Sequence, residues 1–265
     1  SKVAVAKKLN ILCLHGYFQD AAIMKERTPA LRRKLKSIAD FVFIFKYHHS
    51  VDYLDGPITV NSMDGFDPAL GTGSNLDSML QRRKVGKAWW THDKETGAYP
   101  QFESTVDYVL KCYQEHGPFD GIFGFSQGAG LGLFLAALQD KGDIATDFKF
   151  VISYSGFYPS DVSIQVGECF LYEVELLDNR SISIASMHFI GKEDDRVEPQ
   201  SSEYASSIVL SQTERWQSAS WIPSWCIMKA GILSLSTARL KKRSISSCFP
   251  LLNDVFVSLP VLDLL

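Results

Sequence analysis

The chain has 265 residues, of which 46% are hydrophobic and 22% charged, with a formal net charge of −3. This length suits one α/β domain with a sizeable core, and the balanced charge predicts neither a nucleic-acid partner nor a membrane-surface partner. No window reaches the length of a transmembrane helix, and residues 1–8 lack the apolar stretch of a signal peptide. The five cysteines are scattered without a C-x-x-C pair. They favour a reducing, cytoplasmic location over a disulfide framework or a structural zinc site, and nothing predicts a metal or another cofactor.

The first third of the chain predicts two strands and a helix. Residues 9–14 form a continuous apolar run, typical of a buried parallel strand, and His15-Gly16-Tyr17 follows at its carboxyl end. Residues 28–38 have the spacing of a basic amphipathic helix, and residues 41–45 predict a second strand.

A long segment rich in Gly, Asp, Ser and Asn, residues 56–97, then predicts an irregular excursion over the active-site face. Trp89 and Trp90 are its apolar anchor, and we expect them to line the substrate pocket. Residues 102–113 show helical spacing, and Gly117-Pro118 ends that helix.

The sequence then reaches a G-x-S-x-G motif made by Gly124, Ser126 and Gly128. In a nucleophile elbow, this motif joins a strand to a helix by a sharp turn that exposes the serine in a strained conformation. An apolar strand over residues 119–125 precedes Ser126, and a helix over residues 127–139 follows it. This context favours the elbow over a glycine-rich turn without chemistry.

Two further strands, at residues 148–154 and 184–190, complete an alternation of strands and helices. Such alternation predicts an α/β fold with a doubly wound, mostly parallel sheet and helices on both faces. In such sheets the functional loops gather at the carboxyl ends of the strands. The loop after residue 14, Ser126 and the loop after residue 190 all lie at such ends.

The predicted chemistry is that of a serine nucleophile. The hydroxyl of Ser126 needs a base to take its proton, and the base needs an acid to orient it. In this type of fold the acid follows the serine in the chain. Asp194 is the predicted acid, with Asp195 and Glu193 as alternatives, although an acidic cluster of this kind is also typical of a solvated turn.

An oxyanion needs two backbone N–H groups directed at one point. We expect one from Gln127, which follows the nucleophile at the start of its helix, and one from Tyr17 in the loop after the first strand. His15 is predicted to be structural, because it closes that loop and precedes the serine in the chain.

Several segments together resemble the fungal family of serine hydrolases, a group that includes the human ovarian tumour-suppressor-candidate hydrolase. They are Leu12-Cys13-Leu14-His15-Gly16-Tyr17, Trp89-Trp90, Gly117-Pro118-Phe119-Asp120-Gly121, Gly124-Phe125-Ser126-Gln127-Gly128-Ala129 and Gly191-Lys192-Glu193-Asp194. The resemblance covers roughly residues 9–199. It implies an α/β-hydrolase fold, esterase or thioesterase activity on small acyl substrates, Ser126 as nucleophile, Asp194 as acid and a structural role for His188.

The chain departs from this family at two places. Residues 43–50 form an extra stretch containing His48 and His49; an exposed insertion is the plainer interpretation, and a metal or catalytic base is the alternative. The family also places its catalytic histidine in a late Gly-Gly-His-x-Val/Ile-Pro motif. None of the six histidines of this chain follows Asp194, so the triad has no visible base.

The hydrolase domain is therefore predicted over residues 1–205, with an anomalous tail over residues 206–265 in place of the last strand and helix. Reading the tail in a shifted frame allows Gly-Gly-His-Phe-Ile-Pro across residues 229–237, with the histidine codon straddling Gly231 and Ile232. One interpretation is thus an out-of-frame tail. The alternative is a real, diverged tail.

Together these features predict a serine hydrolase that cleaves a small ester or thioester through an acyl-enzyme on Ser126. Because the catalytic histidine is missing, the chain with this sequence is expected to be nearly inactive as a hydrolase. The alternative prediction is a non-catalytic binding protein that kept the hydrolase scaffold.

Overall fold

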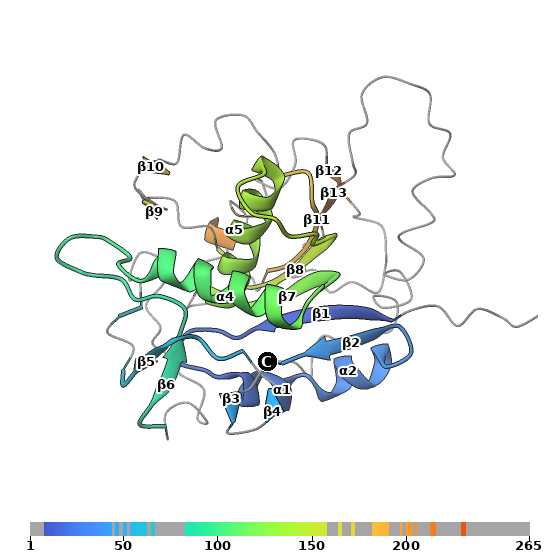
Figure 1. Cartoon of the computed structure of the whole chain (residues 1–265), viewed down its shortest axis with the longest axis horizontal. Coiled ribbons are helices and arrows are strands. Elements are labelled where there is room, and N and C mark those ends of the chain that lie inside the picture. The colour runs from blue at the N-terminus through green and yellow to red at the C-terminus, as the bar shows by residue number, and fades with distance from the viewer. Residues whose placement is uncertain are drawn as a thin grey trace, which may run out of the picture.

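The computed structural model describes residues 8–43, 46–47, 50–51, 54–62, 65–66, 83–157, 164–165, 171–172, 182–190, 197, 200–202, 205, 213–215 and 229–231. Its centre is a five-stranded sheet in the order β11-β8-β7-β1-β2, in which every neighbouring pair is parallel (Figure 1). The strands are β1 (Leu9–Leu14), β2 (Ala39–Val42), β7 (Gly121–Phe125), β8 (Phe150–Tyr154) and β11 (Ala185–Phe189). Their carboxyl ends therefore share one edge, as predicted.

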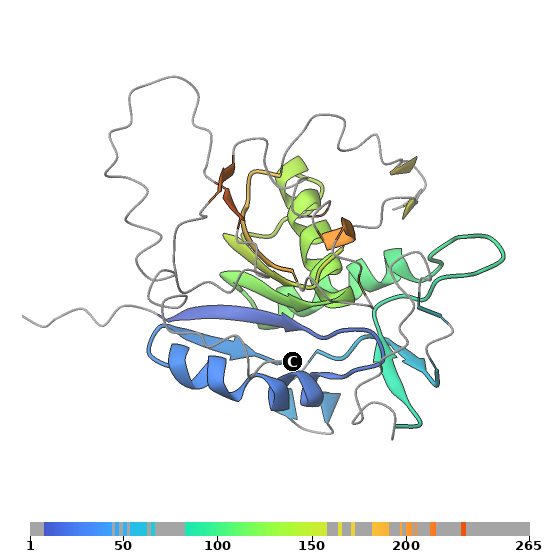
Figure 2. The same ribbon diagram turned by 180° about the vertical axis from the view of Figure 1, so that it is seen from behind.

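Helices cover both faces of this sheet, which confirms the predicted α/β-hydrolase architecture (Figures 1 and 2). Successive side chains of a strand point to opposite faces. Leu12 and Leu14 of β1 pack in the same cluster as residues of α4 (Phe102–His116) and α5 (Gln127–Lys141). Ile11 and Cys13 pack with residues of α1 (Ala21–Arg27) and α2 (Pro29–Leu35) on the opposite face.

Helix α5 is the most deeply buried helix of the core. All of its residues from Gln127 to Leu138 are buried, and it ends at Gly142, whose φ of 84° is left-handed. A helix that is apolar on all sides needs cover on all sides. Its position against the sheet, next to α4, provides that cover and fixes its first turn firmly at the sheet edge.

The helix predicted over residues 28–38 is present as α2, although it ends earlier, and the helix α1 before it was not predicted. The structure has α1 before it, capped by Asp20, whose Oδ1 accepts the Ile23 N–H at 2.9 Å. Thr28 then separates the helices, and Pro29 occupies the first turn of α2, where a missing N–H costs nothing. The apolar spacing of α1 was not recognised because the helix has only two turns.

The excursion over residues 56–97 is more regular than predicted. It contains β5 (Ile58–Val60) and β6 (Gly86–Ala88), which pair antiparallel. Strand β6 also binds the loop after β1, where the Lys87 N–H donates to the Gln19 carbonyl at 2.8 Å. The excursion is thereby fastened to the carboxyl edge of the main sheet.

Three more short strand pairs are present: β3 (Lys46–Tyr47) with β4 (Ser50–Val51), β9 (Ile164–Gln165) with β10 (Leu171–Tyr172), and β12 (Thr213–Arg215) with β13 (Lys229–Gly231). His48 and His49 lie outside the described residues, as does most of the predicted tail. The domain boundary at residue 205 stays a prediction. No helix in the described ranges is long and apolar enough to cross a membrane.

Removing the cap of α1 should destabilise the fold. Asp20 caps the helix and also binds Arg83, with its Oδ2 2.5 Å from Nη2. Asp20→Ala is expected to lower the free energy of unfolding by about 1–2 kcal/mol, as loss of an N-cap does. Urea unfolding measures this. Glu26→Ala removes an exposed carboxylate from the same helix, and a loss as large as that of Asp20→Ala would contradict the capping role.

Candidate active site

Ser126 occupies the turn between β7 and α5, as the motif predicts. Its φ of 50° and ψ of −117° lie in a region that residues with a side chain rarely adopt, so the backbone is strained there. Hydrogen bonds hold this conformation: the Ser126 N–H donates to the Tyr154 carbonyl at 2.8 Å, and its carbonyl accepts from Ala129 and Gly130. Ser126 as a whole residue is 9% exposed.

The two glycines of the motif are required by backbone contacts. A β-carbon at Gly124 would lie 2.5 Å from the Gly128 carbonyl oxygen, across the turn itself. A β-carbon at Gly128 would lie 2.5 Å from the His15 carbonyl oxygen and also clash with that of Leu14. The first turn of α5 thus lies directly on the end of β1, which brings the loop after β1 beside Ser126.

Backbone strain gathers at this edge of the sheet. The non-glycine residues with positive φ in the described ranges are Phe18 (60°), Ser126 (50°) and Ser155 (47°). Each follows a different strand at its carboxyl end: β1, β7 or β8. Such conformations each cost about 1–3 kcal/mol and persist where the surroundings over-determine them, often at functional sites. Phe18 and Ser155 had no sequence signal.

The contacts of His15 confirm its predicted structural role. Its Nε2 accepts the Gly56 N–H at 2.8 Å, and its Nδ1 lies 2.8 Å from the Gly16 carbonyl oxygen. An amide N–H can only donate and a carbonyl can only accept, so the imidazole is neutral with its proton on Nδ1. Burial lowers the pKa of His15, although the bond to Gly16 acts in the opposite direction. Both nitrogens are engaged, so His15 cannot serve as the base.

The predicted oxyanion loop is held tightly in place. The Gly16 carbonyl oxygen accepts from His15 Nδ1 and from the Gln19 N–H, at 2.8 and 3.2 Å. In a planar trans peptide the carbonyl and the N–H of the next residue point in opposite directions. Fixing the Gly16 carbonyl therefore fixes the direction of the Tyr17 N–H, the first predicted oxyanion donor.

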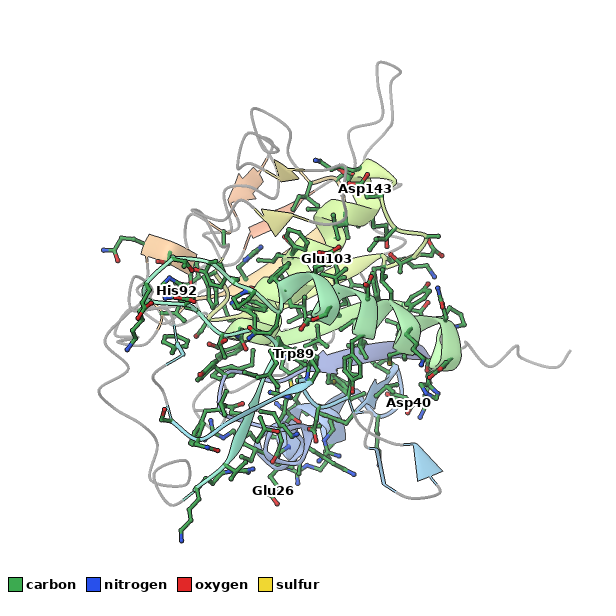
Figure 3. The ribbon with its side chains drawn as sticks, turned by 60° about the vertical axis from the view of Figure 1, so that its left-hand side comes forward. Glu26, Asp40, Trp89, His92, Glu103 and Asp143 are labelled. Carbon is green, nitrogen blue, oxygen red and sulfur yellow. The ribbon has the colours of Figure 1, made fainter. Side chains whose placement is uncertain are left out.

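Trp89 and Trp90 lie inside the core, 0% and 2% exposed, and Figure 3 shows Trp89 at the centre of the molecule. The Trp89 indole Nε1–H donates to the His15 carbonyl at 2.7 Å, and its ring packs 4.9 Å from the His15 imidazole. The Trp90 ring packs against Phe102. Both rings are therefore part of the core next to the loop after β1. Their contact with a substrate stays a prediction.

Sequence reasoning missed the side chain of Gln127. It is 2% exposed; its Oε1 accepts the Trp89 N–H at 2.9 Å and its Nε2 donates to the Trp90 carbonyl at 2.8 Å. The available signal was a single polar side chain among the twelve residues Gln127–Leu138, all of which are buried. A buried amide needs polar partners, and in this segment they had to come from outside the helix.

Asp194 and its alternatives Glu193 and Asp195 lie outside the described residues. His188 is buried in β11, where its Nε2 lies 2.9 Å from Ser186 Oγ. His92 lies two residues after Trp90 (Figure 3). Its ring packs 5.2 Å from that of Tyr99.

The two described cysteines are buried. Burial raises the pKa of the Cys13 thiol well above its usual value and that of Cys112 to about 12, so neither forms a thiolate near neutral pH. No group of three or more His, Cys, Asp and Glu side chains with metal-binding geometry occurs among the described residues.

Enlarging Gly128 should disturb the fold more than enlarging Gly132 in the same helix. Gly128→Ala meets backbone oxygens that cannot move independently, and we expect a loss of about 2 kcal/mol or more in the free energy of unfolding. Gly132→Ala meets a side-chain methyl of Ile122 at 2.9 Å and gains about 1 kcal/mol of helix propensity. Urea unfolding of both variants measures the two changes in the free energy of unfolding. Equal losses in the two variants would contradict the close backbone contact at Gly128.

The neutral, buried His15 should make stability depend on pH. The pKa of His15 is lowered in the folded state. Below the ordinary histidine pKa of about 6.5, the unfolded state therefore binds a proton that the folded state does not bind. Stability should therefore fall as the pH drops from 7.5 towards 5.5. In His15→Gln, which does not titrate, the fall in melting temperature should be smaller. An unchanged pH dependence would contradict the assignment of a neutral imidazole.

Comparison with known proteins identifies the family of this chain. The model of the family described as Serine hydrolase (FSH1) matches residues 4–224. Esterase OVCA2 of Xenopus tropicalis is 32% identical over 200 residues, covering 72% of this chain and 75% of that protein. Rhodanese-like domain-containing protein 6 of Arabidopsis thaliana is 30% identical over 71% of this chain, which spans 30% of that protein's length. The crystal structure of esterase PE8 aligns with a TM-score of 0.46 and 18% identity over 77% of this chain and 78% of that chain. The chain belongs to the FSH1 family of serine hydrolases.

Proposed function

We propose that this chain derives from an esterase or thioesterase that cleaves a small acyl substrate through an acyl-enzyme on Ser126. Attack by Ser126 Oγ on the carbonyl carbon forms the acyl-enzyme and releases the alcohol or thiol, and water then releases the acid. No cofactor takes part in this scheme. The scattered cysteines favour action in the cytoplasm.

The observation that carries the proposal is the strained elbow at Ser126, lying against the end of β1. An oxyanion forms beside the serine oxygen when it attacks, and N–H groups already directed at that point stabilise it. The Gln127 N–H at the start of α5 and the Tyr17 N–H in the adjacent loop are the proposed donors. Both belong to segments held by several hydrogen bonds.

We further propose Asp194 as the acid that orients the base. The base itself is absent from the sequence after Asp194, since all six histidines precede it. His15 is excluded by its own hydrogen bonds. The family match ends at residue 224, before the segment 225–237 in which a shifted frame allows Gly-Gly-His. This supports an out-of-frame tail as the reason for the missing histidine.

A non-catalytic binding protein is the second candidate. The specific observation in its favour is the same missing histidine, since a scaffold without a base can still bind an acyl compound. The two candidates differ in what Ser126 does. In a binding protein its replacement leaves ligand affinity nearly unchanged and there is no turnover to lose.

A variant in which the shifted frame is restored from Trp225 onward should hydrolyse p-nitrophenyl or thioester substrates. Ser126→Ala in that variant should remove all but a residual activity, because the oxyanion donors and binding alone give only about 10³–10⁴-fold over water. Initial rates over a panel of acyl lengths measure this. Undiminished turnover in Ser126→Ala would reject the serine mechanism, and no turnover on any substrate would favour the binding protein.

The chain as written should react slowly with a fluorophosphonate probe, because Ser126 stays protonated without a base. Restoring the frame should raise the labelling rate by orders of magnitude. The coding DNA provides an independent check. A stop codon in the shifted frame across residues 225–237, or a residue other than histidine across Gly231 and Ile232, would contradict the frameshift.

A further inference from the structure

We infer that the Gln127 side chain is a positioning residue that holds the two oxyanion donors in fixed relation to each other. It does so by joining the start of α5 to the Trp89–Trp90 segment, which in turn binds the loop after β1. This inference rests on the proposed function. It assigns to the side chain of Gln127 a task separate from that of its backbone N–H.

The first connection runs from Gln127 to the tryptophan segment. One amide side chain accepts the Trp89 N–H at 2.9 Å and donates to the Trp90 carbonyl at 2.8 Å. All of these groups are buried, so water cannot replace a lost partner. Two bonds from one planar amide fix both the distance and the orientation of Gln127 relative to that segment.

The second connection runs from Trp89 to the oxyanion loop. Its indole N–H donates to the His15 carbonyl at 2.7 Å, and its own carbonyl accepts from Thr105 of α4. His15 then holds the Gly16 carbonyl through Nδ1 and thereby directs the Tyr17 N–H. A chain of buried hydrogen bonds thus joins Gln127 to the peptide that carries the other donor.

The Gln127 N–H is well suited to a task outside the helix. The first N–H groups of an α-helix have no carbonyl partner within it, and in the described part of the chain no backbone carbonyl accepts that of Gln127. Its direction depends on how the first turn of α5 is held. Ser126 precedes it in a strained conformation that could relax, and the side-chain clamp opposes such relaxation.

The same helix offers a matched control. Gln139 lies twelve residues further along α5, about 18 Å away at the rise of an α-helix. Its Oε1 accepts the Phe148 N–H at 2.8 Å and its Nε2 donates to the Phe148 carbonyl at 2.9 Å. The two glutamines therefore make the same kind of clamp, one beside Ser126 and one at the opposite end of the sheet.

The experiment compares Gln127→Met with Gln139→Met in the full chain, using a fluorophosphonate probe. The concentration dependence of labelling gives the maximal rate constant and the probe affinity separately. We expect Gln127→Met to lower the maximal rate constant at least ~10-fold with little change in probe affinity, since a small misplacement of catalytic groups can cost about 10²-fold. Gln139→Met should label at the wild-type rate although urea unfolding shows that it is destabilised.

Equal labelling rates for wild type, Gln127→Met and Gln139→Met would overturn the positioning role and leave the proposed function intact. Parallel losses in the two variants would also overturn it, because they would reflect stability alone. Wild-type labelling that survives Ser126→Ala would contradict the proposed function itself, and the positioning role with it. Gln127→Asn is the second variant if Gln127→Met does not fold; its shorter amide cannot span both partners, and the same outcomes apply.

Discussion

The contact between the first turn of α5 and the end of β1 is the constraint on which the site depends. Gly128 lies so close to the carbonyls of Leu14 and His15 that no side chain fits between them. This approach requires β1 and β7 to be neighbours in the sheet, which they are. It also brings the loop after β1 beside Ser126, so that segments more than a hundred residues apart in the chain meet at one point.

Strain and burial follow from that contact. The chain must turn sharply between β7 and a helix that lies against β1, and Ser126 takes a left-handed φ as a result. Buried hydrogen bonds then over-determine the conformation, through His15, Trp89 and Gln127. The proposed oxyanion donors, held in this way, would need no reorganisation when charge develops on a substrate, which is the physical basis of oxyanion stabilisation.

Local signals in the sequence predicted the main sheet and the elbow. Apolar runs marked β1, β7 and β8, and the G-x-S-x-G motif located Ser126 because its glycines report a close backbone approach. Helix α1 was not predicted because its two turns contain too few apolar positions to show a helical period. Strands β5 and β6 were not predicted because three residues are too few to show the alternation of apolar and polar residues that is typical of a strand.

Long-range polar contacts could not be predicted in the same way. Gln127 binds Trp89 and Trp90, 38 and 37 positions away in the chain, and His15 Nε2 binds the N–H of Gly56, 41 positions away. No local spacing in the sequence indicates such contacts. The strain at Phe18 and Ser155 is likewise imposed by the assembled sheet edge, since neither residue type favours positive φ. The sequence predicted Trp89 and Trp90 as an apolar anchor, but it could not predict the hydrogen bonds that join Trp89 to His15 and Gln127.

The most direct test of the central claim is to identify the residue that a fluorophosphonate modifies. After prolonged labelling of the full chain, digestion and mass spectrometry assign the added phosphonyl group to one side chain. This account predicts that Ser126 carries it, since Ser126 occupies the strained elbow and the first turn of α5 that follows it lies against the end of β1. A phosphonyl group on any other residue, with Ser126 unmodified, would contradict the account.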